Sequence, residues 1–181
     1  SSAASDVYKR QIIGDVSMDF YLLDHEATFK ELEKFNYPNQ RVGVIAHIVN
    51  EKGEVLLQQR GIKARDENGL YEDIGGGFEP DLDINFKAAV IREIKEEAGT
   101  NLTLEIGDSI GICHFYKHSI NWIFIIYFVR YLSGDFQIME TEKCNGYRFF
   151  SYDEALKSDL VTESCKFLIE SIKENYLHDR S

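Results

Sequence analysis

The chain has 181 residues, of which 44% are hydrophobic, and its 20 basic and 31 acidic residues give a net charge of −11. This length predicts a single domain with a sizeable core. The acidic balance argues against a nucleic-acid polymer or an anionic membrane as a partner, because both select basic surfaces.

Cysteine content and hydropathy indicate in which compartment the protein is expected. Cys113, Cys144 and Cys165 are odd in number and lack CxxC spacing, so they predict neither a disulfide framework nor a zinc site. The longest apolar run, residues 122–129, is about half a membrane-spanning helix, and no basic-then-apolar signal opens the chain. We therefore expect a soluble cytoplasmic protein.

The first third of the chain predicts one short helix and one hairpin. Residues 1–11, SSAASDVYKRQ, are mostly small and polar, and we exclude them as non-native sequence or a disordered terminus, which leaves residues 12–181 as the domain. Residues 24–35 have apolar side chains at three-residue spacing, which predicts a short amphipathic helix. Residues 41–49 and 54–59 predict a β-hairpin with Gly53 in its turn.

The remaining elements alternate between strands and helices. A polar loop precedes a short strand at residues 70–74 and three consecutive glycines, and residues 86–98 are rich in helix formers that stop at Gly99. Further strands are predicted at 102–106, 110–116, 122–131 and 147–151, and a last helix at 163–176. Helices around a mixed sheet indicate an α/β or α+β layered domain.

The helix at residues 86–98 carries a crowded acidic face. Glu93, Glu96 and Glu97 point to one sector at about 100° per residue, where like charges repel. One interpretation is a solvated face paired with Lys95, and the other is a cluster held together by divalent cations, which prefer oxygen ligands. The preceding glycines favour the second, because they let the backbone approach a ligand. Residues 79–83 separate these glycines from the helix, which makes a GxGxxG dinucleotide loop a poor match.

The stretch from Gly76 to Thr100 resembles the Nudix hydrolase signature, GX5EX7REUXEEXGU, in which U is a bulky aliphatic residue. Residues 92–99, REIKEEAG, match REUXEEXG without a gap, and Gly76 matches the opening glycine. The stretches EVLLQQRG and GLYEDIGGGFEP extend the resemblance over residues 41–150. It implies the α/β (α+β) Nudix fold, in which a mixed β-sheet is sandwiched between helices.

One departure from the signature concerns its first glutamate. Counting forward from the opening glycine places that glutamate at Leu82, whereas counting back from Arg92 places it at Ile84, so the loop is two residues longer. In the family this glutamate mainly pairs with the motif arginine and braces the loop. We therefore expect Asp81 or Asp83, or the two together, to pair with Arg92 instead.

The resemblance implies hydrolysis of a nucleoside diphosphate linked to another moiety, such as ADP-ribose or a nucleotide sugar, with Mg²⁺ or Mn²⁺. The metal ligands that it implies are the carbonyl of Gly75 and the carboxylates of Glu93, Glu96 and Glu97. Such cations neutralise a diphosphate and lower the pKa of a bound water. The expected partner is a small nucleotide-type phosphate substrate, and a homodimer is left open.

Arg92, Glu96 and Glu142 are the residues we assign to catalysis. The general base is a motif glutamate in some relatives, here Glu96 or Glu93, and a loop glutamate in others, here Glu140 or Glu142. We place Glu142 ahead of Glu140, with a solvated loop charge as the alternative.

Substrate binding is assigned to Arg60, which ends a predicted strand near the glycines, and to Gly76 and Gly77. The alternative for Arg60 is a surface ion pair. Four aromatic residues have either a base-stacking or a core role: Phe115, Tyr116, Trp122 and Tyr127.

Three other functions are compatible with the resemblance. The first is a diphosphatase that removes oxidised (d)NTPs. The second is an isopentenyl-diphosphate-isomerase-like enzyme, which would need a catalytic cysteine that is absent near residues 75–77. The third is a non-catalytic nucleotide-binding Nudix domain, which the intact REIKEE sequence disfavours.

Overall fold

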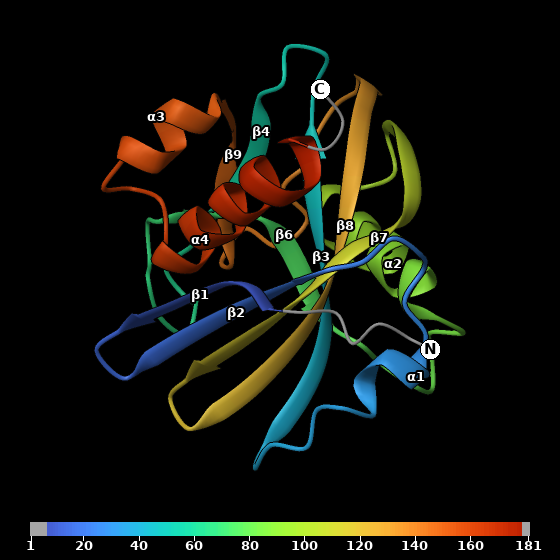
Figure 1. Ribbon diagram of the computed structural model, residues 1–181. Helices are drawn as coiled ribbons and strands as arrows, with labels where there is room; N and C mark the ends of the chain where they lie inside the picture. The colour runs from blue at the N-terminus through green and yellow to red at the C-terminus, as the bar shows by residue number, and fades with distance from the viewer. Residues whose placement is uncertain (1–6, 179–181) are drawn as a thin grey trace.

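Residues 7–178, which the computed structural model describes, form a nine-stranded sheet with helices on both faces (Figure 1). The elements in chain order are β1 (Val7–Ile13), β2 (Val16–Leu22), α1 (Phe29–Leu32), β3 (Gln40–Val49), β4 (Val55–Arg60), β5 (Tyr71–Glu72), β6 (Ile74–Gly77), α2 (Phe86–Ala98), β7 (Leu102–Lys117), β8 (Ile120–Gly134), β9 (Cys144–Phe150), α3 (Tyr152–Lys157), α4 (Glu163–Ser171) and the π-helix η1 (Ile172–Leu177).

The sheet is mixed, as expected from the sequence. Its strands run in the order β1-β2-β7-β8-β3-β4-β5, with β6 paired to β3 and β9 paired to β4. Strand β3 lies parallel to β8, whereas the other pairs of these strands are antiparallel. Strand β3 therefore contacts β8, β4 and β6 and occupies the centre of the domain.

Alternate side chains of β3 point to opposite faces of the sheet. Val44, Ala46 and Ile48 pack in the core cluster that includes the buried face of α2. Ile45 packs in the second cluster, which includes α4 and η1. Figure 1 shows the corresponding layers, with α3 and α4 on one side of the sheet and α2 on the other.

Helix α2 has the bounds predicted from the sequence, because both of its ends are capped. The Asn85 side chain accepts a hydrogen bond from the Ala88 N–H at 2.8 Å. At the other end Gly99 has a φ of +87°, which glycine adopts without steric cost, and its N–H donates to the Lys95 carbonyl.

The hairpin from β3 to β4 is confirmed, with Gly53 at a φ of +77° in its turn. Other elements differ from the sequence predictions. The helix expected at residues 24–35 is limited to α1, and β7 is one strand with irregular pairing near Ser109 rather than two strands. The three glycines belong to β6 itself. Strand β2 and helix α3 were not predicted.

The chain start requires a correction. Residues 1–6 lie outside the described residues, but residues 7–11 are part of β1, which pairs with β2. Lys9 Nζ is 2.5 Å from Glu170 Oε2, and Arg10 Nε donates to Asp19 Oδ1 at 2.6 Å. Residues 7–11 are thus included in the sheet, contrary to the exclusion of residues 1–11. The assignment of residues 12–181 to one domain stays a prediction.

The last predicted helix is present but changes its winding. Thr162 caps α4, its Oγ1 accepting from the Cys165 N–H at 3.2 Å, and η1 continues from Ser171. Phe167 and Leu168 of α4 are buried against the sheet. No helix within the described residues is long and apolar enough to cross a membrane.

Candidate active site

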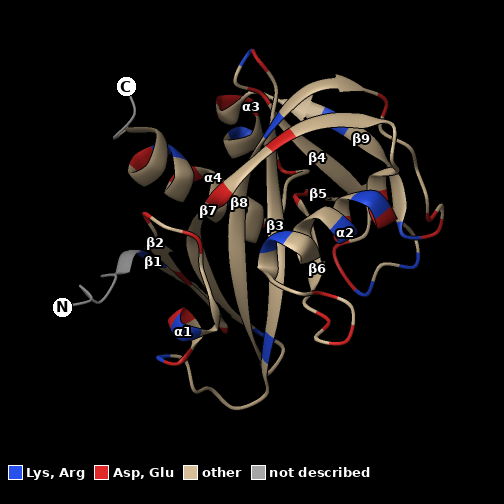
Figure 2. Ribbon diagram, turned by 90° about the vertical axis from the view of Figure 1, so that its right-hand side faces the viewer, with Lys and Arg blue, Asp and Glu red and all other residues tan. Residues whose placement is uncertain are grey.

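The guanidinium of Arg92 forms hydrogen bonds with acidic side chains in the second half of α2. Its Nη1 donates to Glu93 Oε1 at 2.9 Å and to Glu96 Oε2 at 3.2 Å, and its Nη2 donates to the Gly77 carbonyl at 2.9 Å. Figure 2 faces this helix and shows acidic segments on it and on the loop that precedes it. The positive charge of Arg92 offsets part of the repulsion within this face and ties the helix to β6.

Asp83 is the partner that replaces the missing motif glutamate. Arg92 binds it with two hydrogen bonds, from Nε to Oδ1 at 2.8 Å and from Nη2 to Oδ2 at 2.7 Å. The pKa of Asp83 is lowered, mainly because Arg92 donates to it. Asp81 is exposed, and within residues 7–178 it is not among the groups that bind Arg92. The longer loop therefore keeps its ion pair with Arg92 mainly through Asp83, and Glu79 of the same loop lies 3.8 Å from Arg92 Nη1.

Gly76 lets the buried carboxylate of Glu93 lie against β6. A Cβ atom at Gly76 would be 2.4 Å from that carboxylate, whereas one at Gly77 would meet nothing within 4 Å. Glu93 is 8% exposed, and burial raises its pKa above the ordinary value. The opening glycine of the motif is thus required by the position of Glu93.

Glu97 is held one turn further along α2. Gln58 Nε2 donates to Glu97 Oε2 at 2.9 Å, and the Tyr147 hydroxyl donates to the Glu97 carbonyl at 2.5 Å. Burial and, as a smaller cause, the charge of Glu93 together raise the pKa of Glu97 to about 8. Glu93 and Glu97 are thus two neighbouring carboxyl groups with raised pKa values, and a cation bound between them would stabilise their ionised forms.

A polar cavity of about 260 Å³ opens beside Glu97. Its lining residues are Gln58, Arg60, Lys63, Ala64, Arg65, Glu72, Gly75, Glu97, Glu140, Lys143 and Cys144. Carboxylate and carbonyl oxygens are the ligands that Mg²⁺ and Mn²⁺ prefer, so the donor chemistry of Gly75 and the motif glutamates fits the expected cofactor. Across the described part of the chain, no three acidic, histidine or cysteine side chains form a ready metal site, and Arg92 engages both Glu93 and Glu96.

Arg60 lies in this cavity and pairs with Glu72, a carboxyl group that was not predicted as a site residue. Arg60 Nη1 is 2.5 Å from Glu72 Oε1, and its Nε and Nη2 donate to the Asp66 carbonyl and side chain. Burial raises the pKa of Glu72 to about 7. The sequence signal for Glu72 was its position three residues before Gly75 in GLYEDIGGG.

The loop between β8 and β9 presents Glu140 to the cavity rather than Glu142. Glu140 lines the cavity and lies 3.0 Å from Lys143 Nζ. Glu142 is not among the lining residues, and its carboxylate lies 2.7 Å from Lys63 Nζ. The side chain of Glu142 is directed to an exposed ion pair, so Glu140 is the better placed of the two glutamates, and the assignment of Glu142 to catalysis stays a prediction.

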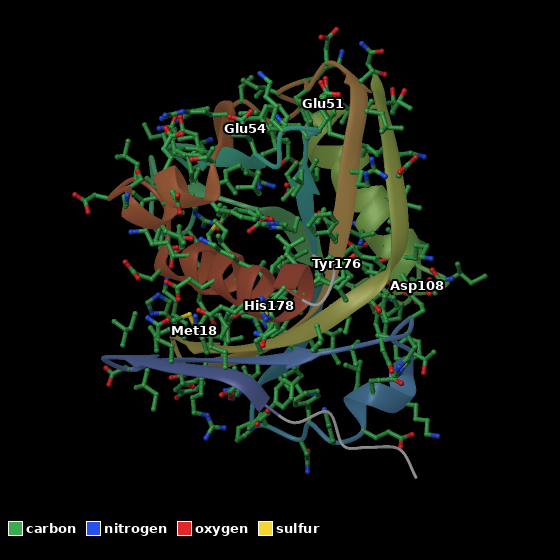
Figure 3. The ribbon with its side chains drawn as sticks, turned by 45° about the horizontal axis from the view of Figure 1, so that its top comes forward. Met18, Glu51, Glu54, Asp108, Tyr176 and His178 are labelled. Atoms are coloured by element: carbon green, nitrogen blue, oxygen red, sulfur yellow. The ribbon has the colours of Figure 1, made fainter. Side chains whose placement is uncertain are left out.

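A second cavity of about 330 Å³ lies between the sheet and α4. Phe115, Trp122 and Phe124 line it, and the rings of the last two stack with centroids 5.0 Å apart and an interplanar angle of 8°. Met18 of β2, labelled in Figure 3, is fully buried and also lines it. By contrast, Tyr127 is a core residue of the α2 face.

The two cavities adjoin each other. Both are lined by Arg60, Arg65, Glu72 and Gly75. The polar cavity is lined by Glu97 of the motif and by several other charged side chains, and the second cavity is lined by the aromatic rings. We therefore treat them as two parts of one candidate site, called below the polar cavity and the aromatic cavity.

Several solved structures are similar to this chain. The MutT protein from Methanosarcina mazei Go1 is 28% identical, with a TM-score of 0.66 over 79% of this chain and 99% of that chain. The NUDIX domain of Shewanella oneidensis NrtR, solved with ADP ribose, is 18% identical, with a TM-score of 0.57 over 82% of this chain and 97% of that chain. The bifunctional NMN adenylyltransferase/ADP ribose pyrophosphatase from Francisella tularensis is 21% identical, with a TM-score of 0.57 over 80% of this chain and 43% of that chain. Among curated protein sequences, none matches.

The family model for the NUDIX domain matches residues 39–169, which is well over half of the chain. That segment contains β3 and β6, the motif helix α2, and strands β7 and β8, which contribute residues to the aromatic cavity. The likenesses below 25% identity show the fold alone, and the family model carries the assignment. The chain therefore belongs to the Nudix family, and it is a hydrolase that acts on acid anhydrides in phosphorus-containing compounds.

Proposed function

We propose that this hydrolase cleaves the diphosphate of a nucleoside diphosphate linked to another moiety, with Mg²⁺ as its cofactor. The observation that carries the proposal is the adjoining pair of cavities, one polar and beside Glu97, the other lined by stacked aromatic rings. A diphosphate suits the first and a nucleobase suits the second, because a base offers an apolar face for stacking.

The charges around the polar cavity support an anionic substrate. Although the chain has a net charge of −11, four cationic residues line this cavity: Arg60, Lys63, Arg65 and Lys143. Arg65 is exposed and makes no ion pair with any described residue. Its guanidinium is therefore available for two hydrogen bonds to a phosphate, while Arg60 is already bound to Glu72 and Asp66.

The motif carboxylates supply the groups that a cation needs. A divalent ion held by Gly75, Glu93, Glu96 and Glu97 would neutralise the diphosphate and lower the pKa of a bound water. Arg92 holds Glu93 and Glu96 in register for this task and is itself fixed by Asp83. Glu96 as general base and Gly76 and Gly77 as substrate contacts stay predictions.

We also propose a cytoplasmic location and a small nucleotide-type ligand. The three cysteines are free thiols and buried, which suits a reducing compartment. The homodimer stays a prediction.

The test is a substrate screen with purified protein and Mg²⁺. The compounds are ADP-ribose, NADH, GDP- and UDP-sugars, dinucleoside polyphosphates and (d)NTPs, and release of mononucleotide or phosphate is measured. Turnover of a nucleoside diphosphate derivative that requires Mg²⁺ supports the proposal. Turnover of (d)NTPs alone, or of no compound, would overturn it.

A further inference from the structure

A buried polar network lies against the aromatic cavity, away from the motif helix. Asp73 lines the cavity and is 8% exposed. Asp73 Oδ1 lies 3.0 Å from His47 Nδ1, and Asp73 Oδ2 accepts from Cys165 Sγ at 3.4 Å. On its other side, His47 Nε2 lies 2.9 Å from the Tyr152 hydroxyl.

Donors and acceptors in this network have one consistent arrangement. A carboxylate only accepts hydrogen bonds, so His47 donates from Nδ1 to Asp73, and its Nε2 accepts from the Tyr152 hydroxyl. Burial raises the pKa of both Tyr152 and Cys165, which keeps both groups protonated as donors. Tyr152, through His47, and Cys165 therefore fix the orientation of Asp73.

The carboxylate of Asp73 keeps acceptor capacity toward the cavity. Each of its oxygens has two lone-pair sites, and the network uses one site on each oxygen. Phe115, Trp122 and Ile45 contribute ring faces and aliphatic groups to the cavity wall. The other carboxylates that line it belong to Asp66, Glu67 and Glu72, and each of them forms an ion pair with Arg60 or Lys117. A fixed acceptor among such groups discriminates between ligands by their hydrogen-bond donors, because an unmatched buried acceptor costs free energy.

We propose that Asp73 selects the base of the substrate and prefers guanine. This inference rests on the proposed function. The N1–H and the N2 amino group of guanine are adjacent donors that match a carboxylate, whereas adenine presents the N1 acceptor at the same edge and is repelled. The ring faces of Trp122 and Phe124 supply stacking that accepts any base. His47 is a positioning residue, which acts by orienting Asp73.

The first experiment uses the unmodified chain and needs no variant. Binding of GMP, IMP and AMP is measured by calorimetry with Mg²⁺. We expect the affinity order GMP, IMP, AMP, because IMP keeps N1–H and lacks the amino group, with AMP weaker than GMP by about tenfold or more. Equal binding of GMP and AMP, or tighter binding of AMP, would overturn the preference for guanine and leave the proposed function standing. If no nucleotide is bound and none of the screened substrates is turned over, the proposed function fails as well.

The second experiment changes the acceptor. In Asp73→Asn the amide can donate to adenine N1 and accept from the adenine amino group, so the preference should shift from GMP to AMP by about tenfold. A variant that weakens GMP, IMP and AMP equally indicates a structural role and overturns the inference. If Asp73→Asn does not fold, His47→Gln and His47→Leu give the answer. The glutamine side chain can still donate a hydrogen bond to Asp73, so His47→Gln should retain a preference for GMP over AMP, and His47→Leu should lose it. An equal ratio of GMP to AMP affinity in the two variants would contradict the positioning role of His47.

Discussion

The two faces of β3 differ in how completely they are filled. Toward α2, Val44, Ala46 and Ile48 are fully buried among apolar side chains. Toward α4, Ile45 borders the aromatic cavity, and His47 is part of a polar network. The filled face holds the acidic helix in place, and the other face leaves room for a ligand. The positions of the α2 carboxylates thus depend on core packing, while ligand selection depends on the side chains that line the aromatic cavity.

The largest effect is expected from Glu97→Gln, which changes the site on the filled face without changing its shape. With Mg²⁺, kcat should fall by about 100-fold or more, because a ligand of the cation that stabilises transition-state charge is lost. The measurement is nucleotide or phosphate release on whichever substrate the screen identifies. Lys95→Gln is the control, since Lys95 is exposed on the same helix. Wild-type turnover in Glu97→Gln would show that Glu97 is not a ligand of the catalytic cation.

The same variant should reveal a pH dependence of stability in the metal-free chain. Burial raises the pKa of Glu97 from 4.5 to about 8, so the folded state retains a proton that the unfolded state loses. The stabilisation from this carboxyl is fully present below pH 4.5 and is lost as the pH rises through about 8. In thermal melts in EDTA, the melting temperature of Glu97→Gln should therefore rise relative to that of wild type as the pH increases from 4.5 to about 8. A difference that does not change with pH would contradict the raised pKa.

Asp83→Asn tests the brace that ties the filled face to the preceding loop. We expect a loss of about 2 kcal/mol in the free energy of unfolding, because a buried charged partner of Arg92 is removed. Since the pKa of Asp83 is lowered in the folded chain, this stabilisation is present near neutral pH and is lost as the pH falls. Urea unfolding measures the difference. Asp81→Asn is the matched control, and equal losses in the two variants would refute the role of Asp83.

Gly76→Ala and Gly77→Ala form a matched pair on β6. A Cβ at Gly76 would meet the Glu93 carboxylate at 2.4 Å, so that carboxylate must shift, and kcat should fall by about tenfold, or roughly 1.4 kcal/mol in the barrier. A Cβ at Gly77 meets nothing within 4 Å, and alanine keeps the backbone groups through which Gly77 would contact substrate, so kcat of this variant should stay near the wild-type value. Steady-state kinetics on both variants decide the matter, and a larger loss in Gly77→Ala would show that Glu93 does not set the requirement.

Arg65→Gln should have the smallest effect and concerns the side of the site that binds ligand. Arg65 is exposed and lines both cavities, so its loss should raise KM by about fivefold while kcat and the melting temperature stay near wild type. Arg130→Gln, at an exposed arginine that lines neither cavity, should leave KM unchanged. If both substitutions raise KM equally, the effect comes from net charge rather than from a contact.

Features encoded in consecutive residues could be predicted from the sequence. Helix α2 has its predicted bounds because Asn85 and Gly99 cap it locally. The replacement of the motif glutamate was narrowed to two aspartates by counting residues, and the structure shows Asp83 as the partner of Arg92. In both cases the relevant groups lie within one turn or one loop of each other.

Features built by distant pairings could not be predicted. His47 and Tyr152 are 105 residues apart, and Asp73 and Cys165 are 92 residues apart, so no sequence window contains the network of the aromatic cavity. Likewise, the choice between Glu140 and Glu142 depends on how the loop before β9 is directed, which spacing does not determine.

The parallel pairing of β3 with β8 has a consequence for how the chain acquires its structure during synthesis. Gln40 lies opposite Asn121 and Val49 opposite Arg130, so the emerging β3 waits for a partner strand that is synthesised 121 − 40 = 81 residues later. Until then one edge of β3 is unpaired, and pairing between strands so far apart in sequence is slow. Both cavities include residues that follow β8 in the chain, so the ligand site is incomplete until they have been synthesised. A nascent chain that stalls before β8 therefore exposes an unpaired strand edge that is prone to aggregation, and no bound ligand can stabilise it.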